Sequence, residues 1–164
     1  MSKRYPPEEP EEWLNRAQSD LLLARMKKEG VYLEDLCFHA QQAVEKAVKA
    51  LMIKQGIEFP YIHDISGLFT LLEGAGQHLP KTVREGAKLT RFAVFTRYPG
   101  IARPISHKEY DTAIRIAESV LRWSRINSRI PNLTGKVFQP SSFAGFPKMC
   151  YFGSIKRNSH PFSS

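Results

Sequence analysis

The chain has 164 residues, of which 42% are hydrophobic, and a formal net charge of +8. This length predicts one domain, because it is enough for one well-buried core and too short for two ordinary ones. Cys37 and Cys150 lie far apart in the sequence, which indicates neither a disulfide framework nor a metal cluster. No apolar stretch approaches the roughly 18 residues needed to span a bilayer, and the first residues lack a signal-peptide core. We therefore expect a cytoplasmic protein with no membrane partner and no cofactor.

The positive charge is concentrated in the last part of the chain. Residues 128–164 contain 5 Lys and Arg and no acid, whereas residues 1–127 contain 19 basic against 16 acidic side chains. The body is therefore only mildly basic. The total charge indicates a polyanion partner for the tail rather than for the body.

The first predicted helix follows the acidic segment at residues 8–12 and runs to about Lys28, because acidic side chains favour a first helical turn. We expect Gly30 to close it. One face of this helix carries Trp13, Ala17, Asp20, Leu21 and Ala24. A carboxylate thus falls within an apolar stripe. Asp20 is expected either to bond with solvent or nearby backbone at the rim, or to act as a site carboxylate paired with a base.

The longest predicted helix spans residues 33–55, which contain neither Gly nor Pro. Its apolar residues fill one sector about 160° wide, as is typical of a helix packed on more than one neighbour. They are Leu36, Cys37, Ala40, Ala43, Val44, Ala47, Val48, Ala50 and Leu51. The remaining sector holds His39, Gln41, Gln42, Glu45, Lys46 and Lys49. Phe38 falls in the middle of this polar sector, where a monomer would expose its ring, so we predict a subunit contact there.

Three further helices are predicted from start and stop signals. Asp64 is a suitable N-cap for residues 65–72, and His63 beside it is interpreted as a loop histidine. A fourth helix begins near Pro80, and its last turns, to residue 95, are apolar nearly all round. Ser106 and Glu109 form a capping box that starts a fifth helix, ending near residue 127. With no convincing strand pattern, the sequence predicts an all-α bundle of about five helices.

Two segments are predicted to be irregular. Residues 96–107 contain two prolines and a glycine, and this loop is the one most expected to hold a site. From residue 128 the composition changes to Ser, Pro, Gly and aromatic residues without a period. This second segment, residues 128–164, is interpreted as an irregular extension that is disordered, that folds onto the body or a partner, or that derives from an altered reading frame or a vector.

Three motifs together resemble a known family. The first is Trp13-Leu-x-x-Ala-x-x-Asp20-Leu, the second is Phe38-His-Ala-Gln-Gln-Ala-x-Glu45-Lys, and the third is Arg97-Tyr-Pro. In order and spacing they resemble prokaryotic HEPN domains over about residues 10–127. The resemblance implies an up-and-down helical bundle that commonly dimerises. It also implies either a partnership with a minimal nucleotidyltransferase or a metal-independent ribonuclease activity.

The ribonuclease members of that family carry an Arg followed by a His after four to six residues. Two such copies meet across the dimer, where they stabilise the transition state and move protons. In this chain Arg103 precedes His107 with only three residues between them. The resemblance therefore leaves Arg103 and His107 as the candidate catalytic pair of a site that departs from the family spacing.

The preferred interpretation is a HEPN module that binds a nucleotide or RNA and acts with a nucleotidyltransferase, without catalysis of its own. Arg97 would grip phosphate, Tyr98 would stack on a base, and Asp20 and His39 would orient them. Three simpler roles stay open: an Arg97–Asp20 ion pair, a Tyr98 plug at the end of the bundle, and a surface or interface position for His39.

The resemblance and the position of Phe38 together predict a homodimer. We expect its interface to include Phe38, Gln42 and Glu45. Two alternative functions remain at this point. The first is a metal-independent endoribonuclease of a toxin–antitoxin pair that uses Arg103 and His107. The second is a protein–protein adaptor that binds no nucleotide.

Overall fold

The computed structural model describes residues 3–60, 63–95 and 104–129, which contain helices and connecting loops but no strand. The helices are α1 (Pro10–Ala24), α2 (Leu33–Gln55), α3 (Ile65–Gly74), α4 (Lys81–Arg84), the 3-10 helix η1 (Glu85–Arg91), α5 (Phe92–Phe95) and α6 (His107–Arg129). The all-α prediction is confirmed. None of these helices is long and apolar enough to cross a membrane.

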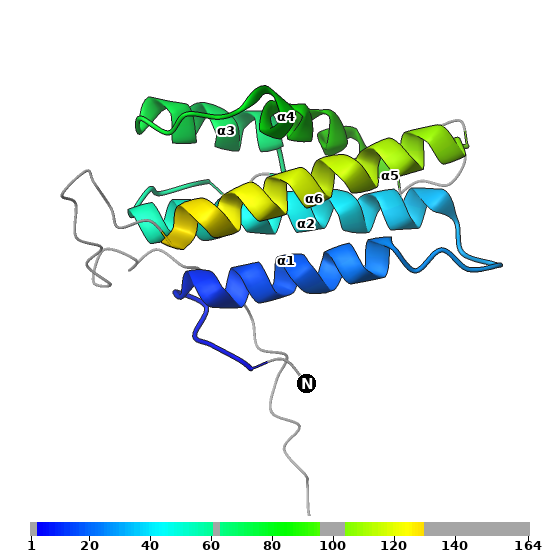
Figure 1. Ribbon diagram of the computed structural model, residues 1–164, viewed down its shortest axis with the longest axis horizontal. Coiled ribbons are helices and arrows are strands. Elements are labelled where there is room, and N and C mark those ends of the chain that lie inside the picture. Colours follow the sequence, from blue (N-terminus) through cyan, green and yellow to red (C-terminus); the bar gives the residue numbers. More distant parts are fainter. Residues whose placement is uncertain (1–2, 61–62, 96–103, 130–164) are drawn as a thin grey trace, which may run out of the picture.

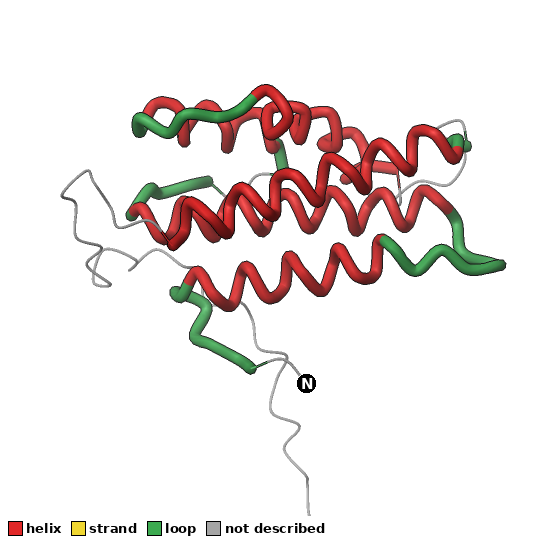
Figure 2. The backbone as a smooth tube through the Cα atoms, in the orientation of Figure 1, coloured by secondary structure: helices red, strands yellow, loops and turns green. Residues whose placement is uncertain are grey.

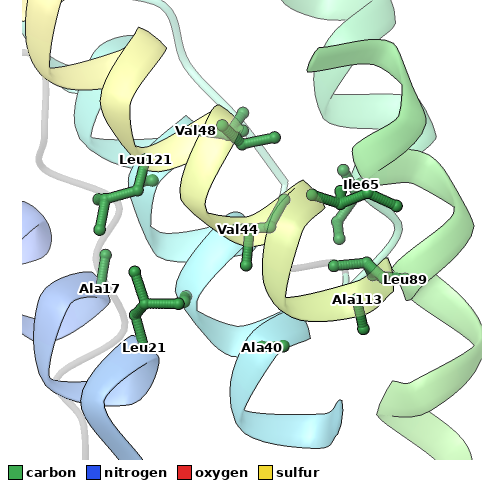
Figure 3. Packing of buried hydrophobic residues seen from close by; sticks show 14 of the residues in the cluster. Ala17, Leu21, Ala40, Val44, Val48, Ile65, Leu89, Ala113 and Leu121 are labelled. Carbon is green, nitrogen blue, oxygen red and sulfur yellow. The ribbon is translucent and has the colours of Figure 1, made fainter. Parts of the chain in front are cut away.

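Helix α2 is the central element of the bundle. It contacts α1, α6, α3, η1 and α5, and Figure 1 shows α6 lying across it, with α1 on one side and α3 and α4 on the other. The apolar sector predicted for α2 fills the core. Its side chains meet those of α1, α3, η1 and α6 in Figure 3, where the labelled residues include Ala17, Val44, Ile65, Leu89 and Leu121. Because α2 is packed on several sides, only a small part of its surface remains exposed.

The helix boundaries that depend on nearby capping residues lie where the sequence predicts them. The Asp64 carboxylate accepts hydrogen bonds from the amides of Ser66 and Gly67, at 3.0 and 3.3 Å. The amide of Ser106 donates to the Glu109 carboxylate at 3.1 Å, and the amide of Glu109 donates to the Ser106 hydroxyl at 3.3 Å. These are the predicted N-cap and capping box. Helix α2 ends at Gly56, whose φ of 66° suits a residue without a side chain.

Helix α1 ends four residues earlier than predicted. Its last residue is Ala24, whose carbonyl oxygen accepts a hydrogen bond of 2.9 Å from the buried hydroxyl of Tyr110. This bond gives the Ala24 carbonyl a hydrogen-bond donor, which in a longer helix would be the amide of the following turn. Gly30, with φ of 83°, belongs instead to the loop that leads into α2. This loop projects from the end of the bundle in Figure 2.

The fourth predicted helix is divided into three parts. Residues 85–91 form η1, which lies between α4 and α5. Gly86 packs closely there, since a Cβ atom added to it would lie 3.0 Å from Phe69 Cζ and 3.2 Å from Val120 Cγ2. Glycine also costs an α-helix about 1 kcal/mol relative to alanine. The single helix predicted from Pro80 is therefore wrong in its middle, where low propensity and close contact with α3 and α6 coincide.

Candidate functional site

One side of α2 remains partly exposed. Between residues 38 and 46 every side chain is buried except Phe38, His39, Gln42 and Lys46, which are each of intermediate exposure. We call these four residues the α2 strip. They extend over about 12 Å, because each helical residue rises 1.5 Å along the axis. The strip combines an aromatic ring, an imidazole, an amide and an ammonium group.

Asp20 of α1 holds two members of the α2 strip. Its Oδ2 atom accepts a hydrogen bond of 2.5 Å from Lys46 Nζ, and its Oδ1 atom lies 3.3 Å from His39 Nδ1. The aspartate residue is 8% exposed, whereas the side chains of Lys46 and His39 are 27% and 33% exposed. A nearly buried carboxylate thus fixes a lysine and a histidine at the surface. Asp20 is therefore paired with two basic side chains, and its role as a site carboxylate stays a prediction.

A second polar cluster lies beside the α2 strip. Glu45 is 4% exposed and accepts hydrogen bonds from Lys49 Nζ at 2.7 Å and from Gln41 Nε2 at 2.9 Å. His63 Nδ1 lies 3.2 Å from both Glu45 carboxylate oxygens. Burial raises the pKa of Glu45. The hydrogen bonds from Lys49 and Gln41 and the charges of Lys49 and His63 lower it by more than burial raises it, so the pKa of Glu45 lies below its ordinary value.

This cluster bears on the predicted interface position of Glu45. We predicted its side chain in a subunit interface, yet its carboxylate is engaged within the chain. Residues that follow α2 cover this side, since Lys49 Nζ lies 5.4 Å from the centre of the Phe59 ring, which itself packs edge-on against Trp13. Any subunit contact here would be made by its neighbours Phe38 and Gln42. Gln42 donates a 2.7 Å hydrogen bond to the Gln41 side chain and so joins the strip to the cluster.

Several residues predicted for the site lie outside the described part of the chain. They are Arg97, Tyr98 and Arg103, together with the tail from residue 130. Their roles stay predictions. His107 is described, and it is exposed as the first residue of α6. Phe38 is partly buried, with its ring centre 5.7 Å from that of His39.

Two contacts of the site were missed from the sequence. Lys46 was placed on the polar side of its helix but was not predicted to bind Asp20, and His63 was interpreted as a loop histidine, with no contact to Glu45 predicted. A signal for Lys46 did exist, because residues 39 and 46 are seven apart and therefore lie two turns apart on one side of a helix. Nothing local predicted His63 beside Glu45, since the contact depends on how the chain returns along α2.

Comparison with known proteins now assigns the family. The family model described as HEPN domain matches residues 10–127, which is most of the chain. The chain belongs to the HEPN family. The domain covers the described helices almost completely, so the α2 strip lies within the matched region.

Two solved structures resemble this HEPN domain. One is the crystal structure of ST0689, an archaeal HEPN homologue, which is 31% identical with a TM-score of 0.61, covering 74% of this chain and 98% of that one. The other is TT1696 from Thermus thermophilus, which is 26% identical with a TM-score of 0.58, covering 72% and 97% of the two chains. Both support the fold described above.

A curated relative matches a shorter part of the HEPN chain. "Putative toxin MJ1304" from Methanocaldococcus jannaschii is 42% identical over 57 residues, which are 35% of this chain and 37% of that protein. The match spans little more than a third of the relative. Its toxin designation therefore bears on this chain only as support for a proposal.

The α2 strip presents several hydrogen-bond donors. Lys46 offers an ammonium group, His39 an imidazole and Gln42 an amide, while Phe38 offers an apolar ring. Within the described ranges, no group of three His, Cys, Asp or Glu side chains is arranged to hold a metal ion. The set of donors suits a phosphate group with an adjoining base better than it suits an apolar ligand.

Proposed function

We propose that this HEPN module binds a nucleotide or an RNA phosphate at the α2 strip, without catalysis of its own. The supporting observation is that Asp20 holds Lys46 and His39 at a partly exposed surface. Pre-ordered donors lose less side-chain entropy when an anion binds. In this proposal the module is a homodimer, works with a nucleotidyltransferase in a cytoplasmic setting, and uses Arg97 and Tyr98 to extend the site.

The position of Asp20 is compatible with an anionic ligand. Its carboxylate is more buried than its two partners, so a phosphate would approach from the side of Lys46 and His39. Lys46 neutralises Asp20, and a ligand phosphate would share its ammonium group, which has three donor hydrogens. Tyr98 would then stack on the base, while Phe38 and Gln42 make the subunit contact.

The test is equilibrium binding of ATP and of a short single-stranded RNA, measured by calorimetry. His39→Gln keeps the Lys46–Asp20 pair and is expected to weaken binding, whereas Lys46→Gln should weaken it by about tenfold or more through loss of a charge-assisted bond. Lys81→Gln on α4, an exposed lysine in a different layer, serves as the control and should bind like the wild-type chain.

Thermal unfolding of each variant identifies losses that come from misfolding. Equal ligand affinity of the wild-type, His39→Gln and Lys46→Gln proteins would contradict the α2 strip as the site. An Arg97→Ala variant tests the extension of the site separately. Failure of every form to bind either ligand would favour the adaptor alternative.

A second candidate function is a metal-independent endoribonuclease of a toxin–antitoxin pair. Its support is the stretch shared with the protein named as a toxin, together with the exposed position of His107 at the start of α6. Purified protein is incubated with total RNA in EDTA, alongside His107→Ala and Arg103→Ala. Cleavage by the wild-type protein that disappears in both variants would replace the non-catalytic proposal with this one.

A further inference from the structure

A groove separates α1 from α6 on a side of the bundle that the proposed nucleotide site does not use. Its volume is about 340 Å³, and its lining comes from these two helices and from Arg25, the residue that follows α1. The floor includes Leu21 and Leu121, which are each 3% exposed. At one place the groove is bridged by Arg25, which donates to the Glu118 carboxylate from Nη2 and, at 3.1 Å, from Nε.

The groove carries an excess of positive charge. Arg122, Arg125 and Arg129 line it along α6, and none of them has a carboxylate partner among the described residues. They are spaced three and four residues apart, so they follow one side of the helix over about 10 Å. Glu118 is the acidic residue in the lining, and Arg25 already neutralises it.

Exposed apolar side chains accompany these arginines. Ile126 lines the groove and is 56% exposed. Leu22 is 55% exposed and follows the buried Leu21 on α1, within one turn of the lining residues Gln18 and Arg25. The groove thus combines a buried apolar floor, exposed apolar side chains and a row of arginines along one side. This combination fits an amphipathic helix with acidic residues flanking its apolar face.

We propose that the groove between α1 and α6 binds an acidic amphipathic helix of a partner protein. The ligand would place apolar side chains over Leu21, Leu121 and Ile126, and carboxylates against Arg122, Arg125 and Arg129. Arginine suits this role because its planar guanidinium binds a carboxylate through two parallel hydrogen bonds. The inference does not depend on the proposed nucleotide site.

Two other occupants fit the groove less well. Single-stranded RNA binds where basic side chains are combined with aromatic rings on which bases stack. The described lining offers no aromatic side chain. A second copy of the chain in a two-fold contact centred here would place the three arginines of one copy against the three of the other. Like charges in such a contact are unfavourable.

The test uses a fluorescein-labelled peptide of about 20 residues with leucines on one helical face and glutamates on both flanks, long enough to form a helix on binding. A peptide of the same composition with its leucines spread around the helix is the first control. A single-stranded RNA of similar length is the second. Fluorescence anisotropy measures the affinity of each for the full chain.

We expect saturable binding of the amphipathic peptide and weaker binding of the rearranged one. Arg122→Glu and Arg125→Glu should each reduce peptide affinity by about tenfold, as loss and reversal of an interface charge pair can produce. Lys81→Glu, which reverses an exposed charge on α4, should leave it unchanged. Ile126→Ala tests the apolar contact without altering charge.

Three results would overturn the proposal. They are no saturable peptide binding, peptide affinity that is equal in the wild-type, Arg122→Glu and Arg125→Glu proteins, and RNA binding that needs these arginines while the peptide does not bind. Thermal unfolding shows whether each variant is folded, and Arg122→Gln replaces the reversal if it is not. The Lys46→Gln variant should bind the peptide normally, which separates this result from a failure of the nucleotide site.

Discussion

Cys37 is an example of a residue whose chemistry is set by its surroundings. Its side chain is buried in the core on α2. Burial, together with the nearby negative charge of Glu34, raises the pKa of the thiol to about 12. The thiolate is the reactive form of cysteine, so the thiol of Cys37 is protonated and shielded at neutral pH.

This burial predicts slow alkylation of Cys37. In a Cys150→Ser variant, which leaves Cys37 as the single thiol, iodoacetamide at about pH 8 should leave the native protein unmodified and should modify it fully in urea. Mass spectrometry counts the added groups. Rapid modification of the folded protein would mean that α2 is less enclosed than described.

Glu45 links the buried cluster to the pH dependence of stability. Its pKa is lower in the folded protein than the ordinary value of 4.5. The carboxylate therefore contributes stability above its unfolded pKa, and this contribution is lost as the pH falls through the lower folded pKa. The difference in unfolding free energy between wild type and Glu45→Gln should be largest at neutral pH and should shrink below about pH 4.5.

Urea unfolding at a series of pH values measures this difference. Glu45→Gln leaves Lys49 with a neutral partner, so its loss at neutral pH is expected to reach about 3 kcal/mol. Glu58→Gln, at an exposed position just after α2, is the matched control and should change stability little. A pH-independent difference for Glu45→Gln would show that its carboxylate makes no charge-dependent contribution.

At the scale of the element, η1 depends on Gly86. Alanine in a helical position usually gains about 1 kcal/mol over glycine. Here the added Cβ would lie 3.0 Å from Phe69 Cζ and 3.2 Å from Val120 Cγ2, closer than ordinary contact. We expect Gly86→Ala to destabilise the protein by about 1–3 kcal/mol, as overpacking in a core does.

The control for this prediction is Gly74→Ala at the end of α3, where, apart from the adjacent residues and the backbone of α3 itself, no described atom lies within 4 Å of the added Cβ. Thermal unfolding should show a lower melting temperature for Gly86→Ala and an equal or higher one for Gly74→Ala. Equal melting temperatures for the two variants would mean that Phe69 and Val120 move aside without cost.

The elements that the sequence predicted well are those whose limits depend on nearby residues. The bounds of α2 follow from an uninterrupted run and a terminal Gly56, and the start of α6 follows from the Ser106 capping box. The end of α1 could not be predicted in this way. It depends on the hydroxyl of Tyr110, which is 86 residues away in the sequence.

The same distinction applies to the candidate site. The helical pattern of polar and apolar residues predicted that Asp20 needs a partner and that His39 lies near the edge of the polar sector of its helix. It did not identify Lys46 as that partner, because the choice depends on how α1 and α2 are rotated against each other. Glu45 was placed on a surface since its covering residues, including His63, come from beyond the end of α2.

At the scale of the whole molecule, we predict that two copies associate through a contact that includes Phe38. Its ring is partly exposed beside His39. Burial of an aromatic ring at a subunit contact is favourable, whereas a charge placed there would have to be desolvated. We expect the wild-type protein to have the mass of a dimer and Phe38→Glu to have the mass of a monomer.

Light scattering after size-exclusion chromatography gives both masses. Leu71→Glu on α3, at a position where the side chain is 38% exposed, introduces the same charge elsewhere and should leave the dimer intact. A dimer mass for Phe38→Glu would place the interface away from the α2 strip. A monomer mass for the wild-type chain would contradict the homodimer itself.

The hydrogen bond between Tyr110 and Ala24 bears on the order in which the chain folds. Helices α1 and α2 are neighbours in sequence and can associate early, because closing a short loop costs little entropy. The last turn of α1, however, is secured by a residue of α6, which arrives from much further along the chain. Amide hydrogen exchange near Arg25 should therefore follow the docking of α6 rather than the formation of α1. Replacement of Tyr110 by phenylalanine should raise exchange there while leaving the exchange of the α1 centre almost unchanged.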